Sequence, residues 1–452
     1  MRTSLLVKVL RARRLLRRRE TWTAAQLAAH QARSVAALRE HARTTSPFYQ
    51  RFHEGLDDAP LSELPVLTKT MLMEHFDSIV TSRDLHLPQV QAFLTGMHPG
   101  ELYRDRYYVA ATGGTTGRPG VFAWTPDEWA GVLASYSRPY AWGRAPLSLT
   151  RRTRMAVVSS RTPWHQSALV ASTVDSRIVP TLRLDAGTPL EDLTASLDAF
   201  QPEVLVGYAS ILRLLADAQA EGQLHISPTA IFSASEVLTE ATRRRTDHAW
   251  GHQPFNVYAA TETAGIAAEC EHHAGLHLFE DLVVTEVVDE NHHPVPAGEF
   301  GAKVLVTVLG SRTMPLIRYE MSDSVRLSTA EPCPCGMPFL RLDGIQGREQ
   351  EALRLTGTSG TDIVVQPVVF HRVMDTVPLS AWQIIQDTDG LTVLVVGLRQ
   401  GVAPQDVAAR LHRELDRIRV APRVVTVREV ERIPRTAIGK APLIRILRSP
   451  TH

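Results

Sequence analysis

The stretch "ATGGTTGRPG", residues 111–120, contains four glycines and three threonines in ten positions. Glycine and proline at this density disfavour both a helix and a central strand. The backbone N–H groups of such a loop can converge on an anion, and threonine hydroxyls add further donors. The stretch lacks the G-x-x-x-x-G-K-[ST] pattern of P-loop nucleotide-binding proteins, and it also lacks G-x-G-x-x-G. Taken alone, it is compatible with a phosphate-binding loop and with a solvent-exposed turn.

The composition bounds the class of protein. The chain has 452 residues, enough for two or three domains. Its 44% hydrophobic and 21% charged residues are typical of a soluble globular protein, and a net charge of +1 gives no general argument for a nucleic-acid partner. No apolar run approaches the length of a membrane span, and residues 1–20 lack the apolar core of a signal peptide. Three cysteines do not form an even disulfide framework, so we expect a reduced, cytoplasmic protein.

Strand and helix patterns alternate in the middle of the chain. Strand-like runs at 154–160, 203–210, 229–235 and 255–259 are separated in part by helical patterns at 211–222 and 236–250, which predicts an α/β sheet with parallel pairing. Three runs at 282–288, 302–309 and 325–329 predict an antiparallel β subdomain. We therefore predict a large N-terminal domain of mixed sheets and helices, residues 1–347. A small, mobile α+β domain, residues 348–452, follows it.

The basic run "RARRLLRRRE", residues 11–20, has two interpretations. It could contact acidic lipid or an acidic partner as an amphipathic helix. It could instead be the solvated face of a first helix that buries Val9, Leu10, Leu15 and Leu16. The chain is otherwise rich in arginine, and its four lysines are Lys8, Lys69, Lys303 and Lys440.

Four further stretches follow the glycine-rich loop: "YAATETAG" at 258–265, "RYEMSDSVRL" at 318–327, "GREQE" at 347–351 and "IPRTAIGKAPLIR" at 433–445. In order and spacing, over residues 105–445, the five stretches resemble the motifs of the adenylate-forming superfamily. This superfamily comprises acyl-CoA synthetases, luciferases and the adenylation domains of peptide synthetases. The segments "AAECEHHAGLHLFED" (267–281) and "PCPCG" (332–336) are similar to the phenylacetate–CoA ligase-like branch.

The resemblance implies a nucleotide site. The glycine-rich loop would hold the β- and γ-phosphates of ATP through Thr112, Gly113, Gly114, Thr115, Thr116, Gly117 and Arg118. The rest of the nucleotide would lie on Ser235, Glu236, Tyr258, Ala259, Asp323 and Arg348. Family members usually carry lysine where Arg118 stands, and arginine also binds phosphate.

The resemblance also implies the groups at the reacting atoms, which are Thr261, Glu262, Arg348 and Lys440. Glu262 would hold Mg²⁺, and Tyr258 would stack on adenine. Asp323 would accept hydrogen bonds from the ribose hydroxyls. Lys440 would reach the substrate carboxylate and the α-phosphate from the mobile C-terminal domain. Without the resemblance, these residues are equally compatible with a helix N-terminus, a turn and solvated surface positions.

The candidates for the acid-binding pocket are Tyr136, Trp164, His165, Tyr208 and Gly265. Aromatic residues at such places are also common in cores.

The three cysteines, Cys270, Cys333 and Cys335, lie near histidines in the sequence or in a turn rich in proline and glycine. Three thiolates and one histidine suit a structural Zn²⁺ with a closed ligand shell, and some members of the resembling branch bind zinc at comparable positions. His273 and His277 are alternative fourth ligands. Unpaired cysteines that pack as small hydrophobic residues are the other interpretation.

The resemblance implies a two-step ligase that uses ATP and Mg²⁺. A carboxylic acid, expected to be aryl or otherwise unsaturated, becomes acyl-AMP, and an acceptor then displaces AMP. CoA is the default acceptor. The segment after residue 352, with "QPVVF" at 366–370 in place of the family's Gly-Val-Asn-Val-Phe-Pro-like turn and Gln350 in place of an expected Asp, puts the thiol acceptor in doubt.

Other functions remain open from the sequence. An amine or carrier-protein acceptor, or a small inorganic anion as the activated substrate, would suit an enzyme of secondary metabolism. A nucleotide-binding module without catalysis is a further alternative, although Glu262, Asp323 and Lys440 are all present. The oligomeric state is also open, with a dimer as one option.

Overall fold

The computed structural model describes residues 3–98, 100–112, 119–146, 151–238 and 240–346. Beyond them it describes 353–365, 367–374, 376–379, 381–386, 390–399, 401–421, 424–431, 433–434 and 444–446. The helices are α1 Thr3–Arg19, α2 Ala24–Thr45, α3 Pro47–Phe52, the 3₁₀ helix η1 Leu61–Glu63, α4 Lys69–Glu74, α5 Phe76–Ile79, α6 Leu87–Gly96, α7 Pro126–Trp142, α8 Gln166–Val174, α9 Leu190–Phe200, α10 Ala209–Ala220, α11 Glu240–Trp250, α12 Pro367–Met374 and α13 Pro404–Arg417. Among the described residues, no helix combines the length and the apolar character needed to cross a bilayer.

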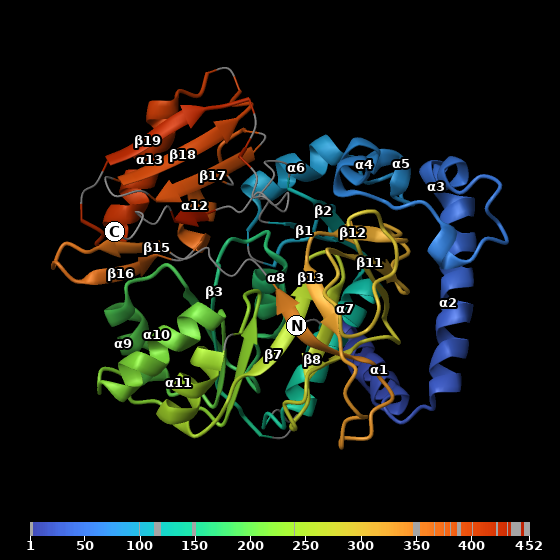
Figure 1. The fold of residues 1–452 in the computed structure, drawn as a ribbon, viewed down its shortest axis with the longest axis horizontal. Coiled ribbons are helices and arrows are strands. Elements are labelled where there is room, and N and C mark those ends of the chain that lie inside the picture. The colour runs from blue at the N-terminus through green and yellow to red at the C-terminus, as the bar shows by residue number, and fades with distance from the viewer. Residues whose placement is uncertain are drawn as a thin grey trace.

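Within the described residues, the strands belong to five sheets (Figure 1). They are β1 Tyr108–Ala111, β2 Val121–Trp124, β3 Met155–Ser159, β4 Thr181–Asp185, β5 Val204–Gly207, β6 Ala230–Ala234, β7 Phe255–Ala260, β8 Ala264–Glu269, β9 Leu276–Leu278, β10 Val283–Val288, β11 Lys303–Val308, β12 Tyr319–Met321, β13 Ser324–Leu327, β14 Arg341–Gln346, β15 Leu353–Thr356, β16 Asp362–Val365, β17 Ala381–Gln386, β18 Gly390–Val396, β19 Val424–Glu429 and β20 Ile444–Ile446.

The largest sheet has nine strands in the order β13-β14-β9-β8-β7-β6-β5-β3-β4. Strands β4, β3, β5, β6 and β7 run parallel, and the remaining pairs are antiparallel. The predicted α/β sheet with parallel pairing is therefore confirmed. The carboxyl ends of β5, β6 and β7 lie at one edge, which is where ligands bind in open α/β sheets.

The third strand of the β subdomain differs from the one that the sequence pattern indicated. Strands β10 and β11, which match the runs at 282–288 and 302–309, form a three-stranded antiparallel sheet with β12. The run at 325–329 does not join it, because its residues form β13, which pairs with β14 at the end of the nine-stranded sheet. The helix expected at 236–250 is described from Glu240 onward as α11.

Helix α7 packs against the nine-stranded sheet and carries one pocket candidate, Tyr136. Thr125 caps its N-terminus, and the Glu128 carboxylate accepts a hydrogen bond from the backbone N–H of Thr125 at 2.8 Å. This capping box, with Pro126 in the first turn, fixes where the helix begins. The same carboxylate accepts from the N–H groups of Arg312 and Thr313, so α7 is held at a defined depth against that loop.

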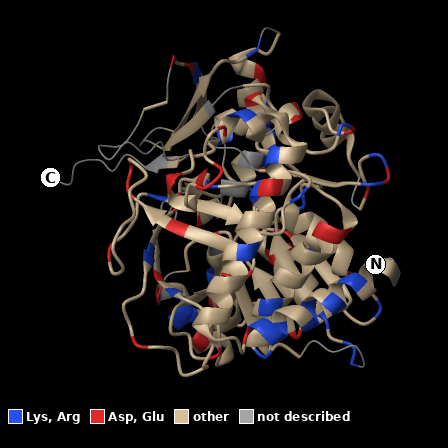
Figure 2. Cartoon of the chain, turned by 90° about the vertical axis from the view of Figure 1, so that its right-hand side faces the viewer, with Lys and Arg blue, Asp and Glu red and all other residues tan. Residues whose placement is uncertain are grey.

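The N-terminal helix α1 packs on α7, and its residues Leu5, Val9 and Leu16 are buried. This supports the interpretation of the basic run as the solvated face of a first helix, and Figure 2 shows the blue arginines along the helix that begins at the N-terminus. The expected burial of Leu15 was wrong: its side chain is 45% exposed, and Leu5 fills that role instead. The reason is register, because Leu5, Val9 and Leu16 share one face at helical spacing.

The C-terminal elements form a small α+β unit, as expected. Strands β19, β18, β17 and β20 make one sheet, and β15 and β16 make a hairpin. In Figure 1 this unit lies at the upper left, above α9, α10 and α11 of the larger part. Ion pairs join Arg372 to Asp185 and Arg419 to Glu191, so α12 and the turn after α13 contact β4 and α9.

Candidate active site

Three parallel strands deliver predicted site residues to one edge of the sheet. Tyr208 follows β5, Ser235 and Glu236 follow β6, and Thr261 and Glu262 follow β7. Because β5, β6 and β7 are parallel neighbours, their carboxyl ends meet at this edge. The arrangement brings together residues that are more than fifty positions apart in the sequence.

The backbone is strained at the same edge. Ser235 has φ +70° and Ala264 has φ +65°, in the left-handed region that non-glycine residues seldom occupy. The ladder between β7 and β8 also shifts register between Tyr258 and Ala259. Strained residues and bulges concentrate at ligand sites, where they re-aim neighbouring groups.

Two residues of separate predicted motifs are in direct contact. The Tyr258 hydroxyl donates a hydrogen bond to Asp323 Oδ2 at 2.9 Å, although 65 positions separate them. The carboxylate of Asp323 keeps further lone pairs that a hydroxyl could use. The aromatic ring expected at adenine and the carboxylate expected at ribose thus lie side by side.

Glu262 lies beside two tyrosines. Burial and the negative charge of Glu262 both raise the pKa of Tyr319, so the phenol remains neutral. Burial also raises the pKa of Tyr136, with smaller contributions from Tyr140 and Glu262. Phenol hydroxyls near a carboxylate can orient it without neutralising its charge, which suits a ligand for a hard cation such as Mg²⁺.

The neck of the glycine-rich loop is a short β hairpin formed by β1 and β2. The Thr112 N–H donates to the Gly120 carbonyl at 2.9 Å, and the Gly120 N–H donates to Thr112 Oγ1 at 2.8 Å. These two bonds close the loop at its base. The predicted phosphate ligands Gly113, Gly114, Thr115, Thr116, Gly117 and Arg118 lie outside the described residues, as do Arg348 and Lys440.

Lys69 also reaches this neck, and sequence reasoning did not select it. Its Nζ donates to Thr112 Oγ1 at 3.3 Å, and a Cβ on Gly120 would lie 3.4 Å from its Cε. The chain arrives there because Leu67 exchanges backbone hydrogen bonds with Arg318 and Glu320 on either side of Tyr319. The only sequence signal was the scarcity of lysine in an arginine-rich chain.

The predicted pocket residues lie between α7, α8 and the sheet edge. The Tyr136 hydroxyl donates to Gln166 Oε1 at 2.7 Å, and Gln166 Nε2 donates to the Thr261 carbonyl at 3.0 Å. His165 and Trp164 precede α8, and both are half-buried. Gln166 is 3% exposed and connects the pocket candidates to the Thr261–Glu262 segment, a role the sequence did not suggest.

The pocket candidates Tyr208 and Gly265 also make contacts that hold neighbouring segments of the protein together. The Ser160 N–H donates to the Tyr208 hydroxyl at 2.9 Å, and burial raises the pKa of Tyr208 to about 12. A Cβ on Gly265 would lie 2.6 Å from Phe279, so this position requires glycine for packing. The Gly265 N–H donates to Ser135 Oγ of α7 at 3.3 Å, which ties α7 to β8.

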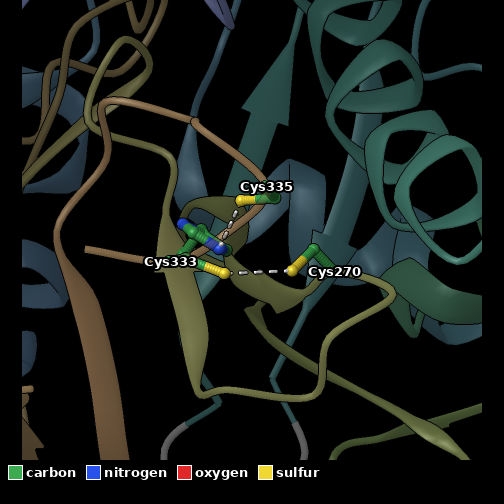
Figure 3. A group of neighbouring side chains, drawn as sticks. Cys270, Cys333 and Cys335 are labelled. Atoms are coloured by element: carbon green, nitrogen blue, oxygen red, sulfur yellow. Dashed lines mark hydrogen bonds between the residues drawn. The ribbon is translucent and has the colours of Figure 1, made fainter. Parts of the chain in front are cut away.

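A second cluster contains all three cysteines (Figure 3). The ligand atoms of Cys270, His277, Cys333 and Cys335 all lie within 4.8 Å of one another. Cys270 Sγ lies 3.6 Å from Cys333 Sγ, and Cys335 Sγ lies 3.4 Å from His277 Nε2. Tetrahedral Zn²⁺ with bonds of about 2.3 Å to sulfur requires ligand separations of this size. Burial lowers the pKa of His277 to about 4, which keeps the ring neutral, as a metal ligand must be.

His273 does not belong to this cluster. Its Nδ1 lies 3.1 Å from Glu269 Oε2, and its ring stacks on Phe255 with centroids 4.5 Å apart. The buried Glu269 carboxylate also pairs with Arg243. Of the two alternative histidines, the structure therefore brings only His277 to the cysteines.

No family model matches the sequence. The phenylacetate-coenzyme A ligase of Thermus thermophilus is 27% identical over 395 residues, which cover 82% of this chain and 80% of that protein. The phenylacetate-coenzyme A ligase of Pseudomonas putida is 27% identical over 262 residues, 55% of this chain and 56% of its own length. The crystal structure of 2-hydroxyisobutyryl-CoA ligase in the postadenylation state, in complex with R3-HIB-AMP, covers 95% of this chain and 92% of that one, with a TM-score of 0.60 and 20% identity.

The likeness to the solved structure concerns the fold, while the curated relatives share sequence along most of the chain. The proteins named in these comparisons are acid–coenzyme A ligases, and the solved structure is a complex with R3-HIB-AMP. The sequence motifs and the position of their residues at the strand edge agree with this similarity to acid–CoA ligases. Over most of its length the chain is similar to a phenylacetate-coenzyme A ligase, and its fold is that of an acid–CoA ligase of known structure.

Proposed function

We propose that the chain adenylates an aryl or otherwise unsaturated carboxylic acid. A carboxylate oxygen attacks the α-phosphorus of ATP, the bond from that phosphorus to the β-bridging oxygen breaks, and pyrophosphate leaves with the electron pair. An acceptor then attacks the acyl carbon of the acyl-AMP, and AMP leaves. Both steps need charge stabilisation and positioning more than covalent help from the protein.

The observation that carries the proposal is the contact between Tyr258 and Asp323 at the carboxyl end of the parallel strands. An aromatic ring beside a hydroxyl-binding carboxylate suits a nucleoside. Glu262 lies on the same side, where a bound Mg²⁺ would neutralise charge on the phosphate oxygens. Thr112 and Lys69 contact each other at the neck of the glycine-rich loop, where the phosphates would bind.

The residues outside the described segments have proposed roles from their motifs alone. The loop Gly113–Arg118 would hold the β- and γ-phosphates. Arg348 would contact the ribose or the domain boundary, and Lys440 would stabilise the carboxylate and the α-phosphate during adenylation. Each role depends on a positive charge or on backbone N–H groups, which these residues provide.

We place the domain boundary at residues 347 and 348. Residues 1–347 would bind ATP and the acid, and residues 348–452 would be a mobile lid that carries Lys440. Two of the three clusters of buried apolar residues lie within residues 5–342. The third contains residues from both sides of the boundary, from Ala156 to Ile231 and from Leu353 to Ile444.

The acceptor proposed by default is CoA. A specific observation favours a second candidate, because residues 367–374 form helix α12 where the family carries a turn that opens the pantetheine tunnel. An amine, a carrier protein or another acceptor would suit a chain that has lost this turn, and a small inorganic anion would be an alternative activated substrate. CoA-dependent product formation separates these candidates.

The test is pyrophosphate release from Mg·ATP over a panel of aryl, cinnamic, aliphatic and amino acids and small inorganic anions, with and without CoA. We expect release with at least one acid. Lys440→Ala should lower it by about a hundredfold or more, while Kd for ATP changes little. Lys8→Ala, at an exposed pair with Asp127, is the matched control.

Two results would contradict the proposal in different ways. An unchanged adenylation rate in Lys440→Ala would reject the role of that lysine alone. If wild-type protein binds ATP but releases no pyrophosphate with any member of the panel, the chain is better described as a nucleotide-binding module.

We further propose that Cys270, His277, Cys333 and Cys335 hold a structural Zn²⁺. Four ligands leave no open coordination position, so the ion would cross-link two loops and take no part in the reaction. The donor set and the separations fit this ion. The loops it would join follow β8 and precede β14.

A further inference from the structure

Glu262 lies in the turn between β7 and β8. The Thr263 N–H donates to the Ala260 carbonyl at 3.3 Å and closes this turn. Thr261 and Glu262 therefore occupy its two central positions, and the Thr261 carbonyl belongs to the peptide between them. The orientation of this central peptide distinguishes one turn type from another. A hydrogen bond to the Thr261 carbonyl thus helps to set the direction in which the Glu262 side chain leaves the backbone.

Gln166, the first residue of α8, supplies that hydrogen bond. Its Nε2 donates to the Thr261 carbonyl at 3.0 Å. Because a carbonyl only accepts, the amide nitrogen must face Thr261, and Oε1 faces the other way, where it accepts from the Tyr136 hydroxyl at 2.7 Å. Burial raises the pKa of Tyr136, so the phenol keeps the proton that it donates. With both ends of its amide bound and 3% of its surface exposed, Gln166 has a fixed orientation.

The backbone next to Gln166 is held at the base of the glycine-rich loop. Ala111, the last residue of β1, donates its N–H to the Trp164 carbonyl at 3.0 Å. Thr112 follows directly and closes the neck of the loop. Residues 164–166 therefore join two parts of the proposed site, which are the base of the loop that would hold the phosphates and the turn between β7 and β8.

Helix α7 holds this turn on both sides. Ser135 Oγ accepts from the Gly265 N–H at 3.3 Å after the turn, and the neighbouring Tyr136 reaches the central carbonyl of the turn through Gln166. Ala264 has φ +65°, a conformation that costs energy in a residue other than glycine and persists where surrounding contacts impose it. Contacts with α7 and α8 therefore contribute to the geometry of the turn.

We infer that Gln166 is a positioning residue, which holds the turn that carries Glu262 in place relative to the base of the glycine-rich loop. The inference rests on the proposed function, in which the loop binds the β- and γ-phosphates and Glu262 holds the Mg²⁺ on the same phosphates. Both parts must then be held in one geometry, and Gln166 lies between them. Gln166 itself contacts neither substrate nor nucleotide and acts through Glu262.

Gln166→Met is the variant that tests this role, because it nearly keeps the length and volume of the side chain and removes both hydrogen bonds. Gln31→Met is the matched control. The Gln31 Nε2 also donates to a backbone carbonyl at 3.0 Å, that of Glu280, and joins α2 to the segment after β9. Circular dichroism of both variants shows whether they keep the wild-type fold.

The measured quantity is Kd for α,β-methylene-ATP, which cannot release pyrophosphate, determined by calorimetry in EDTA and in Mg²⁺. We expect wild-type protein to bind more tightly with Mg²⁺. Gln166→Met should lower the ratio of Kd in EDTA to Kd in Mg²⁺ about three- to tenfold, because the central carbonyl of the turn loses its partner. Kd in EDTA should change little, and Gln31→Met should keep the wild-type ratio.

A double variant tests whether Gln166 acts through Glu262. Glu262→Gln alone should lower the same ratio, and adding Gln166→Met should lower it no further, because the two changes remove one shared effect. A further fall as large as that of Gln166→Met alone would mean that the two residues act independently and would overturn the inference.

The remaining outcomes separate the inference from the proposed function. Equal ratios in Gln166→Met and Gln31→Met overturn the inference. If Gln166→Met does not fold, Tyr136→Phe takes its place, since it keeps the ring and removes the O–H that orients the amide. It should lower the ratio about threefold, and an unchanged ratio overturns the inference. Absence of pyrophosphate release with every acid overturns the proposed adenylation alone, because the ratio is measured without the reaction.

Discussion

Lys69 brings an ammonium group to the neck of the glycine-rich loop through its contact with Thr112. In the proposed function this cation would face phosphate oxygens. We expect Lys69→Met to raise KM for ATP about tenfold, because a charge-assisted hydrogen bond contributes about 1.5–3 kcal/mol. Initial-rate kinetics over a range of ATP concentrations measures this. Lys303→Met is the control, since Lys303 pairs with Glu320 elsewhere; equal KM values in the two variants would contradict the role of Lys69.

Single residues were predictable where a motif surrounds them. Tyr258, Glu262 and Asp323 came from motifs, and the structure adds that Tyr258 contacts Asp323. Lys69 could not be found this way, because its position depends on backbone pairing between segments 250 residues apart. The choice between His273 and His277 was equally beyond the sequence, since it depends on the buried carboxylate that binds His273.

The β8–β9 connection and the loop before β14 are joined at the cysteine cluster. We expect Cys333→Ser to lower both the zinc content and Tm, because binding energy at a structural site is also folding energy. Elemental analysis and thermal unfolding of the same samples test this. His273→Ala is the matched control, because it removes a histidine of the same stretch without touching the cluster. Wild-type protein without zinc after purification in metal-replete buffer would reject the site.

Helices and strands were predictable where the apolar residues of the sequence form a regular pattern. The parallel strands β3, β5, β6 and β7 coincide with apolar runs of the sequence. Strands that are buried on both faces of a sheet read as nearly continuous apolar runs, so the sequence predicts them well. Strand β13 was placed in the wrong sheet because the apolar pattern does not name a partner. Its ladder with β14 depends on residues 341–346, which the pattern of residues 325–329 cannot encode.

For the whole molecule, the proposed boundary makes a prediction about fragments. A chain ending at residue 346 keeps β14, the cysteine cluster and two complete apolar clusters. We expect it to fold, to retain zinc and to lack adenylation, because Lys440 is absent. A chain ending at residue 328 lacks β14, Cys333 and Cys335, and we expect it to be insoluble. Circular dichroism and sedimentation compare the two; similar solubility of both fragments would contradict this division of the chain.

The order of strands in the large sheet has a consequence for how the protein is made. Strand β9 pairs with β14. His277 and Leu276 can therefore pair with Arg341 and Leu342 only after β14 has been synthesised. During synthesis on the ribosome, β9 emerges while its neighbour is still untranslated. Until then its unpaired N–H and C=O groups form an open edge that another nascent chain can occupy. Slow translation between these two strands would therefore prolong the time during which this edge of β9 is open.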